Sequence, residues 1–287
     1  MTRSILELDA SSIQNPIHQV KGKAVEKTTD WIAREEPLEI KVNHGPVENR
    51  HTFTLSITMR TPGNDYDLVR GFLFTEGIIR RKEQIKSITY DLNLSPAQQQ
   101  LNSVLVTLSP DVILDAGQLE RHFYTSSSCG ICGKTSIEMV KLQSSFFPPT
   151  NPKAISKEVI HQLPEILKNE QSTFQQTGGI HAAALLDPTG ELISVEEDIG
   201  RHNAVDKLVG WALEEGHVPL RNRILFVSGR AGFELVQKAV MAGVTFFVAI
   251  GAASSLAIEL AEENKMTLIG FLGPEKFNVY TGSDRIL

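Results

Sequence analysis

The stretch HAAALLDPTGELISV, residues 181–195, decides the fold class. Residues 182–186 are small or apolar, the tetrapeptide DPTG at 187–190 is a strong turn signal, and residues 192–195 return to a strand pattern. This order predicts a β-hairpin. Beyond the hairpin, apolar runs of strand length alternate with helical patterns over short loops. The alternation predicts a sheet with parallel strand pairs that is covered by helices.

The chain before residue 121 has a different pattern. Segments 38–42 and 52–59 alternate between apolar and polar residues, which predicts two strands joined by a short turn. A helix is expected between the turn at 61–65 and Gly77. Residues 1–34 are polar and predict a loose arm or an edge strand. The other expected elements are strands at 85–90, 103–108, 223–227, 244–250 and 267–272, and helices at 158–168, 203–214, 233–241 and 255–263.

These patterns predict an α/β protein with two domains, which also agrees with a typical domain size of ~100–200 residues. The N-terminal α+β domain is expected at 1–120. The C-terminal α/β domain is expected at 121–287 and carries both cysteines of the chain.

Composition restricts the partners. The 287 residues carry a formal net charge of -6, so no electrostatic footprint for nucleic acid is expected. The most apolar segment, 244–253, is about half of the ~20 residues that a membrane-spanning helix needs. Residues 1–30 contain no apolar run typical of a secretory signal. We therefore expect a cytoplasmic protein that binds neither nucleic acid nor membrane.

The two cysteines, Cys129 and Cys132, lie in the loop-like segment SSSCGICGKT at 126–135. Two cysteines are too few for a disulfide scaffold. We therefore expect the pair to serve in metal binding, redox chemistry or nucleophilic chemistry. Lys134 and a helix that begins near Thr135 would both favour the thiolate, which is the reactive form of a cysteine. The pair is the first candidate for catalysis.

Several kinds of chemistry compete for this pair. A zinc site would need further ligands from His122, His181 or His202, and the proton-carrying glutamate of a zinc deaminase is missing. A phosphate-binding P-loop would need glycine where Ser128 stands. A thioredoxin-like site fits the position of the pair poorly. Sulfur transfer needs only a thiolate that can carry a persulfide and a second thiol that can resolve it. No metal is predicted, although a zinc-binding module stays an open alternative.

Further motifs resemble, in order, those of the formate dehydrogenase accessory sulfurtransferase family (FdhD). The resemblance spans roughly residues 35–287 and is far more specific than one C-x-x-C pair. The motifs that carry it are EPLEI (36–40), GFL with EGII (71–79), SSCGICGK (127–134), TGG with HAAA (177–184), EDIGRHNAVDK (197–207), SGRA with VQK (228–238) and FNVYTG (277–282).

The resemblance implies a function. Members of the family take sulfur from a cysteine desulfurase and hold it as a persulfide on the first cysteine of the motif, which is Cys129 here, with Cys132 assisting. They deliver the sulfur to the bis-molybdopterin guanine dinucleotide molybdenum cofactor and so activate formate dehydrogenase. The resemblance also implies a homodimer and a cytidine-deaminase-like fold for the C-terminal half. The alternative is a non-enzymatic chaperone that binds the same cofactor and whose cysteines are only structural.

The family's contact with the cofactor maps to the segment after the last expected strand. Ligands of open α/β sheets lie beyond the carboxyl ends of strands, which suits this position. Phe277 could stack on guanine, Asn278 could bind the edge of the base and Lys276 could face phosphate. Glu275 departs from the usual family pattern and weakens the expected phosphate contact. The full predicted set is Pro274, Glu275, Lys276, Phe277, Asn278 and Val279.

Four other polar residues keep open roles. His181 and His202 could relay a proton, bind the cofactor or be structural. Arg201 and Arg230 follow expected strand ends, where they could hold phosphates. Alternatively, the two arginines could form ion pairs with the nearby acids Asp198 and Glu234.

Overall fold

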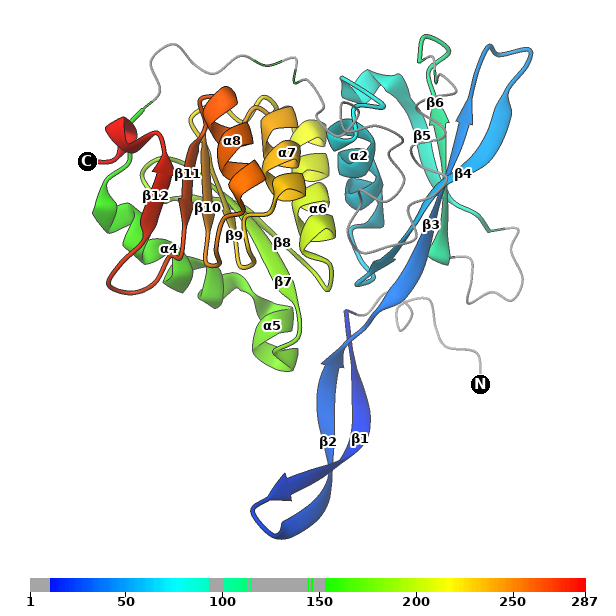
Figure 1. Cartoon of the computed structure of the whole chain (residues 1–287). Coiled ribbons are helices and arrows are strands. Elements are labelled where there is room, and N and C mark those ends of the chain that lie inside the picture. Colours follow the sequence, from blue (N-terminus) through cyan, green and yellow to red (C-terminus); the bar gives the residue numbers. More distant parts are fainter. Residues whose placement is uncertain (1–10, 93–100, 113, 115–143, 145, 147–152) are drawn as a thin grey trace.

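Three β-sheets and the helices packed on them form the described part of the chain in a computed structural model (Figure 1). The structure describes residues 11–92, 101–112, 114, 144, 146 and 153–287. The predicted mixed α/β class is confirmed. No helix of these residues combines the length and the apolar character that crossing a membrane requires.

The six-stranded C-terminal sheet has the order β12-β11-β10-β9-β7-β8. The pairs β9–β10 and β10–β11 are parallel, whereas β7, β8 and β12 run antiparallel to their neighbours. The predicted hairpin is β7–β8, and the carboxylate of Asp187 closes its turn by accepting the N–H of Thr189 at 2.8 Å. The bounds are β7 His181–Leu186, β8 Leu192–Asp198, β9 Ile224–Val227, β10 Phe246–Ala249, β11 Thr267–Gly270 and β12 Asn278–Thr281.

Helices cover both faces of this sheet (Figure 1). Every residue of β9, β10 and β11 is buried, as expected for strands packed on two sides. Helices α4 (Lys157–Glu170) and α5 (Ser172–Thr177) lie on one face. On the other face lie α6 (Arg201–Glu214), α7 (Phe233–Met241) and α8 (Ser255–Glu263), and a 3-10 turn, η4 (Ser283–Arg285), follows β12.

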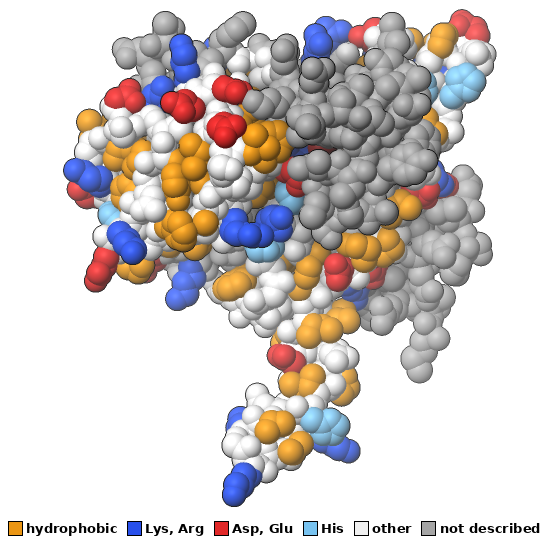
Figure 2. Space-filling model, viewed as in Figure 1, with side chains coloured by type: hydrophobic (Ala, Val, Ile, Leu, Met, Phe, Trp, Pro, Cys, Tyr) orange, Lys and Arg blue, Asp and Glu red, His pale blue; other side chains and the backbone are white. Residues whose placement is uncertain are grey.

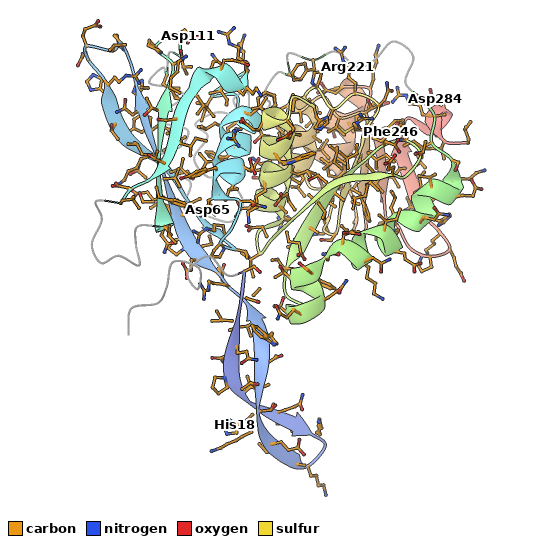
Figure 3. The ribbon with its side chains drawn as sticks, turned by 180° about the vertical axis from the view of Figure 1, so that it is seen from behind. His18, Asp65, Asp111, Arg221, Phe246 and Asp284 are labelled. Atoms are coloured by element: carbon orange, nitrogen blue, oxygen red, sulfur yellow. The ribbon has the colours of Figure 1, made fainter. Side chains whose placement is uncertain are left out.

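The N-terminal sheet has four strands in the order β4-β3-β6-β5. Helix α2 lies between this sheet and α6 (Figure 1). It begins beside a buried ion pair in which the Arg60 guanidinium donates to both carboxylate oxygens of Asp65, at 2.8 and 2.9 Å. Figure 3 labels Asp65 on the side of this unit that faces the C-terminal sheet. The bounds are β3 Glu36–His44, β4 His51–Arg60, α2 Asp65–Thr75, η1 Lys82–Gln84, β5 Ile85–Tyr90 and β6 Ser103–Leu108.

Two glycines bring α2 and α6 into backbone contact. A methyl group on Gly71 would lie 1.8 Å from the carbonyl oxygen of Asp206, and one on Gly210 would lie 1.9 Å from that of Asp67. No side chain fits at either position. The hydrophobic core runs without interruption through this contact, from Leu38 of β3 to residues of β11. The two sheets therefore share one core, and the predicted boundary at 120/121, which lies outside the described residues, stays a prediction.

The N-terminal residues form an arm. Strands β1 (Ser12–Lys21) and β2 (Ala24–Ala33) make a two-stranded antiparallel hairpin that projects from the body, with His18 far out on it (Figures 1 and 3). Near its base, the hydroxyl of Ser12 donates to the side-chain oxygen of Gln176 in α5 at 2.7 Å. The expected arm is therefore a regular hairpin with one anchored end.

Candidate functional site

The carboxyl edge of the C-terminal sheet collects the loops that follow β8, β9, β10 and β11. Because β7 and β12 run antiparallel to their neighbours, their first residues, His181 and Asn278, lie at this edge too. Helices α6, α7 and α8 each begin here, directly after the loops of β8, β9 and β10. Helix N-termini carry partial positive charge and unpaired N–H groups, so this edge favours anions.

The predicted cofactor segment lies at the same edge. Asn278 and Val279 begin β12 and pair with Gly270 and Ile269 of β11. The turn before them is closed by the N–H of Gly273, which donates to the carbonyl of Lys276 at 2.9 Å. The sequence predicted no strand here, so β12 is an addition to the expected sheet. Exposed side chains within the segment are those of Pro274, Glu275, Lys276 and Asn278.

Phe277 differs from these residues because its ring is half-buried. It packs against the smaller core of the C-terminal unit, and its ring centroid lies 5.0 Å from that of His161. The predicted pair Cys129 and Cys132 lies outside the described residues, as does His122. The cysteine pair and the cofactor segment both stay predictions.

The motif at 197–207 has a buried part and a half-buried part. In the buried part, the ammonium of Lys207 lies 2.9 Å from Oδ2 of Asp198. Both side chains also bind the backbone of Thr61 in the N-terminal unit. Lys207 donates to the carbonyl of Thr61 at 2.9 Å, and the N–H of Thr61 donates to the carboxylate of Asp198 at 3.1 Å. Asn203 adds a bond to the carbonyl of Met59 at 2.7 Å. These residues join the two sheets.

Asp206, near the end of the motif, has the same structural role. Its carboxylate accepts from the hydroxyl of Thr75 in α2 at 2.7 Å and pairs with the ammonium of Lys238 in α7 at 2.8 Å. Burial alone would lower the pKa of Lys238, but the carboxylates of Asp206 and Glu76 raise it to about 12. Lys238 is therefore charged at every physiological pH, and this part of the motif is a structural link.

The half-buried part of the motif, together with His181 of β7, holds the candidate chemistry. His202 Nε2 lies 2.9 Å from a carboxylate oxygen of Glu234, at the start of α7. His181 Nδ1 lies 3.4 Å from the hydroxyl of Ser228, whose oxygen accepts the N–H of Ala182 at 3.0 Å. Burial lowers the pKa of His181, and the nearby Arg201 and His202 lower it further. His181 is thus neutral near pH 7, and its hydrogen-bond role depends on its tautomer.

The two arginines have no carboxylate partner among the described residues. The two acids that the sequence offered them have other partners. Asp198 pairs with Lys207, and Oε2 of Glu234 pairs with His202, while Oε1 of Glu234 is buried without a hydrogen-bond partner among the described residues. The interpretation of Arg201 and Arg230 as partners of these acids is therefore wrong. Figure 2 shows basic side chains beside a histidine on the face of the C-terminal unit, next to a broad apolar area.

One functional candidate was missed by sequence reasoning. Phe271 follows β11 with a backbone φ of 52°, and 50% of the residue is exposed. Its N–H donates to the carbonyl of Gly251 at 3.0 Å, which ties it to the loop after β10. A bulky residue in left-handed conformation is strained, and such strain is concentrated at functional sites. The sequence placed Phe271 inside the strand at 267–272, and its only signal was Gly270 directly before it and Gly273 two residues after it.

A comparison with protein families decides the identity of the chain. The model of the FdhD/NarQ family matches residues 33–287. The chain belongs to the FdhD/NarQ family. The resemblance inferred from the motifs is confirmed.

Relatives of the FdhD/NarQ family match nearly the whole chain. The chain is 44% identical over 280 residues to a protein from Mycolicibacterium paratuberculosis named sulfur carrier protein FdhD, covering 97% of this chain and 100% of the relative. A protein of the same name from Saccharolobus solfataricus is 40% identical over 268 residues, covering 93% and 95% of the two chains.

A solved structure supports the fold. The putative formate dehydrogenase accessory protein from Desulfotalea psychrophila superposes with a TM-score of 0.69 over 97% of this chain and 100% of that chain, at 21% sequence identity. At this identity the likeness shows the fold alone. Within the described residues, no group of three or more His, Cys, Asp and Glu side chains is placed to hold a metal ion.

Proposed function

We propose that this FdhD/NarQ-family chain is a sulfur carrier for the maturation of formate dehydrogenase. It receives sulfur from a cysteine desulfurase as a persulfide on Cys129 and delivers it to the molybdenum of the bis-molybdopterin guanine dinucleotide cofactor. The observation that carries this proposal is the 44% identity, over 97% of the chain, to a curated sulfur carrier protein FdhD. The cysteine pair of the chain supplies the thiols that such a carrier needs.

Sulfur uptake is an exchange between two thiols. The Cys129 thiolate attacks the outer sulfur of the persulfide on the desulfurase. One S–S bond forms on Cys129 while the S–S bond on the desulfurase breaks, and the desulfurase cysteine leaves as a thiolate. No external oxidant or reductant is needed, because the transferred sulfur keeps its oxidation state. The product on this chain is a Cys129 persulfide.

Delivery requires two electrons, because the sulfur leaves the persulfide as sulfide. The thiolate of Cys132 can supply them by attacking the inner sulfur of the persulfide, which is that of Cys129. A Cys129–Cys132 disulfide forms and hydrosulfide is released to the metal of the cofactor. A cellular dithiol then reduces the disulfide and restores both thiols. This step gives Cys132 a role that is separate from carrying sulfur.

The carboxyl edge of the C-terminal sheet is the proposed place for the cofactor, which is a substrate here. Exposed Lys276 and Asn278 lie there beside the start of three helices. A guanine nucleotide offers a flat base and negative phosphates, which such an edge favours. We further propose that the chain acts in the cytoplasm as a homodimer, as its resemblance to the family implies.

Mass spectrometry of the intact protein and its peptides tests the proposal. Wild type, Cys129→Ala and Cys132→Ala are incubated with a cysteine desulfurase and L-cysteine. We expect wild type and Cys132→Ala to gain one reducible sulfur on the peptide that holds Cys129, and Cys129→Ala to gain none. If no variant gains sulfur while guanine-nucleotide binding persists, sulfur transfer is wrong and the cofactor chaperone replaces it.

A further inference from the structure

The arm of β1 and β2 projects from the body with large apolar side chains exposed to water (Figure 2). Val20 and Val25 are cross-strand partners near its tip, and they are 65% and 63% exposed. Trp31, closer to the base, is exposed as well. A hairpin of two strands with no core of its own is at best marginally stable in water. The arm therefore has the character of a surface that another molecule covers.

The outer face of the arm continues onto the N-terminal sheet. Strand β3 begins directly after the two residues that follow β2, and side chains along such a stretch alternate between its two faces. The buried residues here are even-numbered, namely Arg34, Leu38 and Ile40, whereas Trp31, Glu35 and Pro37 are exposed. The odd-numbered residues from Val25 to Pro37 thus share one outer face.

This outer face has a second apolar patch at the base of the arm. Pro37 is the cross-strand partner of Met59 in β4, and Ile57 lies two residues before Met59 on the same face. Met59 is 47% exposed and Ile57 is 58% exposed. The tip and the base patch are separated by about 40 Å of extended strand, counted from Val25 to Pro37, and Trp31 lies midway between them.

We propose that the outer face of the arm binds the same face of a second copy of the chain, with the two arms antiparallel. A two-fold axis at Trp31 places the tip of each copy on the base patch of the other, so that every contact occurs twice. Trp31 then lies beside its own copy at the centre of the interface, where tryptophan is typically a dominant residue. The homodimer belongs to the proposed function, on which this interface rests.

Opposite charges also meet in this alignment. Lys27 and Glu35 lie four residues before and four residues after Trp31, and both are exposed. Lys27 of each copy therefore faces Glu35 of the other. Thr29 and Ala33, which flank Trp31 on the same face, are small enough to leave room for the indole rings. The alignment was set by the apolar ends alone, so the match of charges supports it independently.

The size of the shared face indicates a reversible dimer. The face is about 40 Å long and two strands, about 10 Å, wide. Its footprint of about 400 Å² per copy is about half that of a standard interface. We therefore expect the dimer to dissociate at micromolar concentrations.

Sedimentation velocity of the full chain between ~1 and ~100 μM tests the interface. Wild type should change from monomer to dimer over this range. Lys27→Glu and Glu35→Lys should each weaken the dimer about tenfold, because each change brings like charges together twice. The double variant exchanges the two charges and should dimerise like wild type. Lys168→Glu, on exposed α4, carries the same change of charge and should have no effect.

Tryptophan fluorescence gives a second measurement at the proposed axis. In Trp211→Phe, Trp31 is the only tryptophan of the chain. Its emission should shift to shorter wavelengths as the protein concentration rises, because the indole leaves water. Trp31→Ala should weaken the dimer about thirtyfold or more, as expected for a central tryptophan. Thermal unfolding checks that each variant is folded.

Three results would overturn the interface or its alignment. Wild type that stays monomeric would exclude both the interface and the homodimer, whereas the sulfur carrier would still be decided by persulfide formation on Cys129. A dimer that Trp31→Ala and both single charge reversals leave intact would show that the copies meet on another surface. If the single reversals weaken the dimer and the double variant does not restore it, the antiparallel alignment is wrong.

Discussion

The ammonium of Lys207 lies 2.9 Å from the carboxylate of Asp198, with exposed side-chain fractions of 2% and 0%. Lys207 has two further acceptors, the carbonyls of Thr61 and Glu197. Asp198 accepts from the N–H groups of Thr61 and Gly200. One ion pair thus connects the end of β4 to β8 and α6, which fixes the helix whose first residue is Arg201.

Replacing Lys207 by methionine should destabilise the protein strongly. The change leaves the Asp198 carboxylate buried without its cation, which typically costs about 3–5 kcal/mol. Chemical denaturation of Lys207→Met and of Lys168→Met measures the effect. Lys168 is exposed on α4, so its variant should unfold like wild type. A loss below about 1 kcal/mol for Lys207→Met would contradict the structural role of the pair.

Replacing Gly210 by alanine should separate α2 from α6. Alanine normally stabilises a helix by about 1 kcal/mol relative to glycine. Here its methyl group would lie 1.9 Å from a backbone oxygen, which no rotamer can avoid, so we expect a net loss of about 3 kcal/mol or more. The control is Gly179→Ala, whose methyl group would have no neighbour closer than 3.8 Å. Equal unfolding midpoints for both variants would refute the close contact.

Pyrophosphate is a probe for the phosphates of the guanine nucleotide that we propose at the carboxyl edge of the C-terminal sheet. Its binding should strengthen as pH falls, because His181 gains a proton in the complex. Burial lowers the pKa of His181 in the free protein, Arg201 and His202 lower it further, and only Asp198 opposes them. A bound anion favours the charged ring and raises this pKa. Affinity therefore increases as pH falls through the pKa of the complex and levels off below that of the free protein.

Affinities of wild type and His181→Gln between pH about 5.5 and 8 measure this effect. Pyrophosphate and the His202–Glu234 pair titrate in both proteins, so the difference between the two curves isolates His181. Parallel curves would show that His181 does not face the bound anion.

Phe271→Ala should weaken the binding of guanosine diphosphate and leave that of pyrophosphate unchanged. Stacking of a base on an aromatic ring is worth about 1–3 kcal/mol, so we expect a loss of roughly 5- to 150-fold. Phe277→Ala serves as the comparison, because its ring packs on His161 and the core, and its loss should lower the unfolding free energy. If only Phe277→Ala, still folded, loses the nucleotide, then Phe277 is the stacking residue that the sequence predicted.

The sequence predicted those elements whose signals are local. The strands β5 and β6 and the helices α7 and α8 agree with it to the residue, because turn residues and apolar periods bound them. The hairpin around Asp187 is also present, but its second strand runs to Asp198 and not only to residue 195. Strand β12 was missed, because Asn278–Thr281 becomes a strand only by pairing with β11. Strands β10 and β11 end earlier than their apolar runs, and this hid the exposure of Phe271.

The motif at 197–207 shows the same limit for the site. The sequence of this motif does not reveal which of its charged residues face the core and which face outward. Asp198 of β8 pairs with Lys207 of α6, and Glu234 of α7 pairs with His202 of α6. These tertiary partners leave Arg201 and Arg230 without an acidic partner in the part of the chain that the structure describes.

The free strand edges of the projecting arm could promote aggregation, and several residues of the arm oppose it. Two edge strands of ten residues each present unpaired backbone groups on which other chains could assemble into aggregates. Pro16 in β1 has no N–H to donate, and the tip carries three cations, Lys21, Lys23 and Lys27, of which Lys21 pairs with Glu26 at 3.7 Å. Both features oppose strand addition by neighbouring molecules, so the arm can stay extended at the concentrations of a crowded cell.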